Sequence, residues 1–199
     1  MKTGIIAALP LVLLLAGCAS TSVKRVDADT VTDLSGYWND TDIRIVCDSL
    51  IKSCLDDPRV AQEAKKLGRN PVFLVGRFRN ESDEHIDTSI IADTMRVAIR
   101  RSGRADFVAG GAGRDAVRGE RQDQQGNASE ATASRLGNET GADFLLEGSV
   151  KVVPDRSGNT STRTYFVTAE LTNIETNIVL WDDQNSEIKK VIKTSSTRF

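Results

Sequence analysis

His85 is the only histidine of the chain and the first candidate for acid–base or nucleophilic chemistry. Ser82 and Asp83 lie beside it, but a Ser-His-Asp triad is assembled in space rather than from sequence neighbours. Ser82 also lacks the G-x-S-x-G turn that exposes a serine nucleophile. Three roles stay open for His85: a solvated loop or cap position, which is the simplest, a partner contact, and catalysis.

Gly111, Gly113 and Ala116 have the G-x-G-x-x-A spacing of a dinucleotide-binding loop. The motif needs a second strand ending in an acidic residue about twenty positions later, where this sequence predicts helix. We therefore interpret residues 111–116 as a flexible loop. Since no nucleophile motif or metal-ligand cluster is found either, we predict no catalytic, cofactor-binding or metal-binding residues and no enzymatic activity.

Cys18 follows Leu15, Ala16 and Gly17 at the end of a short apolar run that starts after Lys2. This run is too short to span a bilayer and is typical of a cleaved signal peptide. The four residues resemble the bacterial lipobox, which predicts acylation of the Cys18 thiol, with palmitate among the fatty acids, and cleavage before Cys18. Ala19 in place of Asp predicts transport to the outer membrane. The alternative is an ordinary secretory peptide that ends near a cysteine.

The predicted organisation is a lipoprotein signal peptide over residues 1–17, a lipidated N-terminus and flexible tether over 18–35, and one globular domain over 36–199. Fully stretched, the tether reaches at most about 60 Å. With 26 basic and 28 acidic residues the chain has a net charge of −2, which gives no basic excess for nucleic acid. We expect the protein to be held by its lipid anchor on the periplasmic face of the outer membrane.

Apolar spacing predicts four helices and a fifth, solvated one. The first, capped by Asn39 or Thr41, carries Cys47 and Cys54 on its apolar stripe and stops at Pro58. These cysteines lie about 10 Å apart along a straight helix, too far for a disulfide, so we expect two buried thiols. The other helices are predicted over 60–67, which is the weaker pattern, over 88–102, over the solvated segment 114–125, and over 129–141.

Strands are predicted over residues 72–78 and 105–109, followed by an antiparallel meander over 144–153, 164–173 and 178–184. Residues 155–161 and 175–177 form its turns. Phe144 and Trp181 are predicted core residues. The fold class is α+β: a single domain with a mixed sheet flanked by helices. Residues 80–87 are predicted to be a polar, solvated loop after the first strand.

Three sequence blocks together resemble the LpoB family of penicillin-binding-protein activators. They are SGYWNDTD at residues 35–42, GRFRNES with EHIDT at 76–88, and RLGNETGADF at 135–144. The resemblance implies a fold like the N-terminal domain of TolB. It also implies an outer-membrane lipoprotein that binds a class A penicillin-binding protein, stimulates peptidoglycan synthesis and so affects cell wall biogenesis and cell shape.

For the partner contact we select Arg79, Glu84 and His85, because a polar loop on a rigid scaffold commonly carries binding residues. One departure from the family is the short tether without proline, since the family pattern has a long Pro-rich tether. A domain that does not reach its partner does not activate it. The alternative function is therefore a non-enzymatic envelope assembly or secretion lipoprotein with a TolB-like domain.

Overall fold

The computed structural model describes residues 22–27, 30–137 and 139–195. Cys18 and the predicted signal peptide lie outside this part. The chain divides before Val31, and the fold belongs to the unit that begins there. Its helices are α1 (Asp40–Asp56), α2 (Pro58–Leu67), α3 (Thr88–Ser102) and α4 (Gly111–Asn127). Its strands are β1 (Val72–Asn80), β2 (Asp106–Phe107), β3 (Phe144–Ser157), β4 (Thr160–Asn173), β5 (Val179–Asn185) and β6 (Lys189–Lys193).

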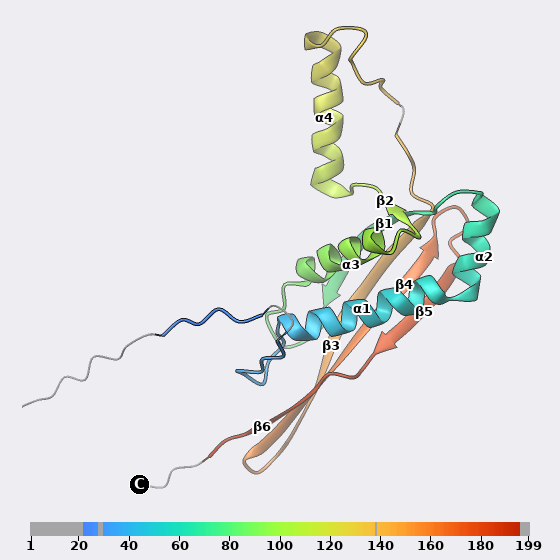
Figure 1. The fold of residues 1–199 in the computed structure, drawn as a ribbon. Helices are drawn as coiled ribbons and strands as arrows, with labels where there is room; N and C mark the ends of the chain where they lie inside the picture. The colour runs from blue at the N-terminus through green and yellow to red at the C-terminus, as the bar shows by residue number, and fades with distance from the viewer. Residues whose placement is uncertain (1–21, 28–29, 138, 196–199) are drawn as a thin grey trace, which may run out of the picture. The chain divides into compact units, whose positions relative to one another are not determined.

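The six strands form one mixed sheet in the order β2-β1-β3-β4-β5, with β6 paired to β4 beyond the end of β5 (Figure 1). β1 is parallel to β2 and β3, whereas β3, β4 and β5 form the antiparallel meander. The α+β class and the mixed sheet flanked by helices are confirmed. Helices α1 and α3 supply the apolar residues that pack on one sheet face.

The core confirms the apolar patterns on which the prediction rested. Asn39 caps α1 through a reciprocal capping box with Asp42. Cys47 and Cys54 are buried free thiols, and burial raises the pKa of each to about 12. Phe144 and Trp181 are buried as predicted.

The predicted helix over residues 129–141 is wrong: residues 129–137 form turns and irregular backbone. Leu136 is exposed, so the segment has no apolar face to bury against the sheet. Glu139 instead accepts hydrogen bonds from Arg118 of α4. The flexible loop predicted over 111–116 is also wrong, because those residues form the first turns of α4.

The turn predicted over residues 155–161 is shorter than expected. β3 and β4 pair from Phe144 opposite Asn173 to Ser157 opposite Thr160, which leaves only Gly158 and Asn159 in the loop. The φ angle of Gly158 is +57°, a conformation typical of two-residue hairpins. Sequence patterning missed β6, whose lysine-rich segment lacks an apolar run, and overestimated β2, which has two residues.

Candidate partner-binding site

The loop between β1 and α3 is held in a compact conformation by the side chain of Asn80. Its amide nitrogen donates to the backbone carbonyl of Glu84 at 2.7 Å, and its oxygen accepts from the Ser82 hydroxyl at 2.6 Å. Ile86 is buried, and Thr88 donates to the carbonyl of Phe78 at 2.5 Å. The loop is therefore fixed to the sheet at both ends.

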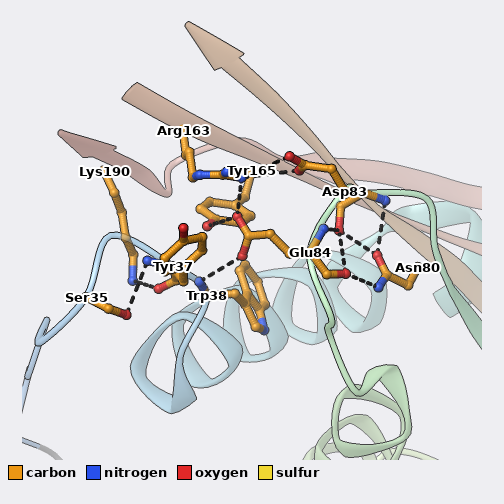
Figure 2. A network of polar contacts seen from close by, with 10 residues as sticks. Ser35, Tyr37, Trp38, Asn80, Asp83, Glu84, Arg163, Tyr165 and Lys190 are labelled. Carbon is orange, nitrogen blue, oxygen red and sulfur yellow. Dashed lines mark hydrogen bonds and ion pairs between the residues drawn. The ribbon is translucent and has the colours of Figure 1, made fainter. Parts of the chain in front are cut away.

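Glu84 points from this loop into the protein, as Figure 2 shows. Its Oε1 accepts hydrogen bonds from Arg163 Nη1 and from the Tyr165 hydroxyl, both at 2.7 Å, and its Oε2 accepts from the backbone amide of Trp38 at 3.3 Å. The Glu84 side chain is only 7% exposed. The expectation that Glu84 lies in a solvated loop without a structural role is wrong. Its tertiary partners come from distant segments.

Arg163 and Tyr165, two positions apart on β4, connect the loop to the segment before α1. The Arg163 guanidinium lies over the Tyr37 ring, 5.0 Å from its centroid, and also contacts Asp83 at 3.2 Å. The Trp38 and Tyr165 rings pack with their centroids 5.2 Å apart. Burial and the hydrogen bond to Glu84 raise the pKa of Tyr165, so its hydroxyl stays a donor.

Lys190 of β6 holds the other side of that segment. Its ammonium, 8% exposed, contacts Asp42 at 2.6 Å and Asp33 at 2.8 Å, and donates to the carbonyl of Tyr37 at 2.8 Å. Burial raises the pKa of Asp42, whereas the hydrogen bond from Lys190 lowers that of Asp33. Because these contacts fasten residues 32–38 to the sheet, we name residues 32–38 the N-terminal strap.

Gly36 makes this close approach of the strap possible. A Cβ atom at position 36 would lie 2.0 Å from Cγ1 of Ile192 on β6. No residue with a side chain fits there unless Ile192 moves. Glycine is thus required at this point for steric reasons, not for its backbone angles.

The three selected residues do not form one cluster. Arg79 lies opposite Ser149 on β3, is largely exposed and forms an ion pair with Glu81 at 3.1 Å. Glu84 is turned inward, and His85 is exposed on the loop. Asp83 and His85 are exposed on the loop, and Tyr37, which shares Arg163 with Asp83, is 52% exposed.

Sequence reasoning missed Tyr37, Arg163, Tyr165 and Lys190 as members of this site. Tyr37 stood in one of the blocks quoted for the family resemblance, which was the available signal. Arg163 and Lys190 carry no local signal, because the acids they bind lie 79 and 157 positions away in the sequence. Tertiary pairing of β4 with β6 brings them together.

Within the described residues, no helix combines the length and apolar character needed to cross a membrane. Among curated proteins, none matches the chain. Solved structures similar to it include the LpoB C-terminal domain from Escherichia coli, at 15% identity and a TM-score of 0.40, covering 74% of this chain and 96% of that one.

Two further structures are similar at this level. The NMR structure of E. coli LpoB has 13% identity and a TM-score of 0.39, with 98% of this chain and 86% of that chain covered. Lipoprotein GNA1162 from Neisseria meningitidis has 20% identity and a TM-score of 0.36, with 64% and 87% covered.

The family model described as peptidoglycan-synthase activator LpoB matches residues 42–187. This match runs from the first turn of α1 to the residues just before β6, and so includes the loop, Arg163 and Tyr165. Since it spans most of the chain, the protein belongs to the LpoB family of peptidoglycan-synthase activators.

Proposed function

We propose that this protein is a non-enzymatic lipoprotein, anchored through Cys18 to the periplasmic face of the outer membrane, that binds and activates a class A penicillin-binding protein. The observation that carries the proposal is the family match over residues 42–187. An activator shifts a synthase toward its active state only if it binds that state more tightly. The partner-binding surface must therefore have a fixed shape.

The surface around Tyr37, Asp83 and His85 meets this requirement. Arg163 contacts both Tyr37 and Asp83, and the hydrogen bond from Arg163 to the buried carboxylate of Glu84 fixes the orientation of Arg163. Tyrosine and arginine are enriched among the residues that dominate binding energy at protein interfaces. We infer that Tyr37 and His85 contact the synthase and that Glu84 positions them. Arg79 lies on the face of the sheet that points away from α1 and α3. Its contact with the synthase stays a prediction.

The test is stimulation of a purified class A penicillin-binding protein by the full chain in detergent. We measure glycan polymerisation and peptide cross-linking. Tyr37→Ala and His85→Ala are expected to weaken stimulation at least severalfold while far-ultraviolet circular dichroism and melting stay unchanged for His85→Ala. Asp48→Ala, an exposed substitution on α1, is the matched control. Full stimulation by both variants would place the contact surface elsewhere.

The short tether favours the alternative of an envelope assembly lipoprotein. Thr32 is already in contact with the domain, because its carbonyl accepts from Asn39. The residues between Cys18 and Thr32 span at most about 45 Å if fully extended. If wild-type protein neither co-purifies with a class A penicillin-binding protein from envelope extracts nor stimulates one, this alternative replaces the activator function.

A further inference from the structure

The sheet has a second face that no described helix covers. Side chains alternate between the two faces of a strand, and the buried residues of β3, such as Leu146 and Val150, point toward α1 and α3. Glu147, Ser149 and Lys151 point the opposite way. We name this second face of β3, β4, β5 and β6 the open face. α4 has no buried residue and does not shield it.

One end of the open face carries three carboxylates in a single row. Glu147 lies directly opposite Glu170, which lies directly opposite Asp182. In the described part of the chain, none of the three has an ion pair or side-chain hydrogen bond. No metal-binding group of three or more such side chains occurs there. Like charges at directly paired positions destabilise a sheet. Arg79 of β1 lines the same hollow as Glu170 and Asp182 but is paired with Glu81, so a positive charge brought from outside would relieve this repulsion.

The other end of the open face is basic. Lys189 pairs with Thr164, and Lys193 pairs with Thr160, so both lysines share the face of the acid row. Within residues 30–137 and 139–195, neither lysine has an ion pair. Two exposed apolar side chains, Val153 and Val191, lie on the same end at 55% and 59% exposure. The open face therefore has an acidic end, a basic end and apolar contacts.

These two ends are spaced for self-complementarity. Glu170 and Thr164 are six residues apart on β4, so the row of Asp182 and the row of Lys189 are about 20 Å apart. β5 and β6 follow one another along the same edge of β4. A two-fold axis across the strands at the level of Val167 exchanges the two rows. It places Asp182 of one copy opposite Lys189 of the second.

We propose that the open face binds a second copy of this chain to form an antiparallel, two-fold symmetric dimer. The strands of residues 145–157 extend for about 40 Å, and three neighbouring strands span about 14 Å. Two such faces bury roughly 1,200 Å² in total, the lower end of the range for specific interfaces. The dimer is therefore weak enough to depend on its charge pairs, each of which occurs twice by symmetry.

The test measures the mass of the full chain by analytical ultracentrifugation, with detergent micelles in excess so that lipid does not bring two copies together. Wild-type protein is expected to dimerise at low salt and to dissociate as added salt screens the charges. Asp182→Lys alone and Lys189→Glu alone are each expected to weaken the dimer roughly tenfold or more, because like charges then face each other twice.

An equimolar mixture of the two variants gives the decisive result. In a mixed pair, Lys at 182 faces Glu at 189 and Lys189 faces Asp182, so both contacts are attractive and dimers return. Asp48→Lys on α1 changes the net charge by the same amount as Asp182→Lys without touching the open face, and it should dimerise as wild type does. The proposal is overturned if the wild-type protein is monomeric at low salt. It is also overturned if the equimolar mixture of the two variants does not form dimers. No synthase is present, so the outcome is independent of the proposed activation.

Discussion

Glu84 illustrates how a polar loop residue acquires a structural role. Its carboxylate links the loop after β1 with Arg163 and Tyr165 of β4 and with the amide of Trp38. A buried carboxylate is favourable only when hydrogen bonds and a counter-charge replace its water. Here Arg163 supplies the charge and three donors complete the shell.

Replacement of Glu84 by Gln keeps the shape of the side chain but leaves Arg163 without its buried counter-charge. We expect Glu84→Gln to lower the free energy of unfolding by about 1–3 kcal/mol, the usual range for hydrogen bonds to charged groups. Urea titration measures it. Asp83→Asn is the matched control, since Asp83 is 57% exposed and contacts the same arginine. Its effect should stay below about 1 kcal/mol. Equal losses for both variants would contradict the structural role of Glu84.

Asp143 gives the domain a defined pH dependence. Its carboxylate accepts two hydrogen bonds from Arg69, at 2.7 and 2.9 Å, and one from the amide of Val72 at 2.8 Å. Burial opposes ionisation, but these bonds outweigh it and lower the pKa of Asp143 below 3.8. The stabilisation is therefore present above pH 3.8 and is lost as the pH falls through the lowered pKa.

Asp143→Asn is accordingly expected to destabilise the protein by about 1–3 kcal/mol near neutral pH. The difference from wild type should shrink as the pH falls below 3.8 and through the lowered pKa of Asp143, where the wild-type carboxyl also becomes neutral in the folded protein. Urea titrations at both pH values measure it, with Asp155→Asn on the exposed hairpin as control. A difference that does not depend on pH would show that ionisation of Asp143 is not responsible.

The N-terminal strap and α4 differ in regular structure and in packing: the strap is irregular but packed on the sheet, whereas α4 is regular but has no buried residue. The strap has no regular secondary structure, yet Lys190, Arg163 and Ile192 hold it against β4 and β6. α4 is a regular helix of 17 residues with no buried residue. Tertiary contacts, rather than helical or extended backbone, decide which element is part of the core.

Two Gly→Ala substitutions separate these elements. Gly36→Ala forces a methyl group into Ile192, and we expect a loss of about 1–3 kcal/mol, as for other overpacked sites. Gly119→Ala in α4 meets no atom within 4 Å and should be neutral or stabilising by up to about 1 kcal/mol. Hydrogen exchange of the strap amides shows whether the loss of stability in Gly36→Ala is located in the strap. Unchanged strap protection in Gly36→Ala would show that the strap does not pack on Ile192.

The complete protein presents two surfaces that serve different partners in our proposals. Tyr37 and His85 lie on the loop and strap surface, whereas the charge rows lie on the open face. The proposed lipidation site, Cys18, precedes the strap in the sequence. Membrane anchoring, synthase contact and dimerisation are therefore separable by mutation.

Cys18→Ala tests the anchor. The variant is expected to lose incorporation of radiolabelled palmitate and to remain unprocessed or be released from the outer membrane fraction. Several acyl chains give stable anchoring, whereas one chain is marginal. Cys47→Ala is the control, because Cys47 is a buried thiol and its loss should not affect labelling. Equal incorporation of label into Cys18→Ala would disprove the assignment.

Much of the fold follows from local patterns in the sequence. The apolar stripe of α1 with its Asn39 cap, the β-rich run of β1 and the alternating residues of β3 each report which side of an element is buried. Burial on one side is a property of spacing, so a single sequence predicts it. The Leu15–Cys18 pattern likewise needs no fold to be recognised.

What the tertiary structure alone decided is how distant polar residues meet. Glu84 and His85 are neighbours in the sequence, but one is turned inward and the other outward because Arg163 and Tyr165 stand on only one side of the loop. The lysines of β6 and the acids of β5 share a face only because both strands pair with β4. Hydrogen bonds and ion pairs act over a few ångströms in space, irrespective of separation along the chain, and local patterns carry no record of them.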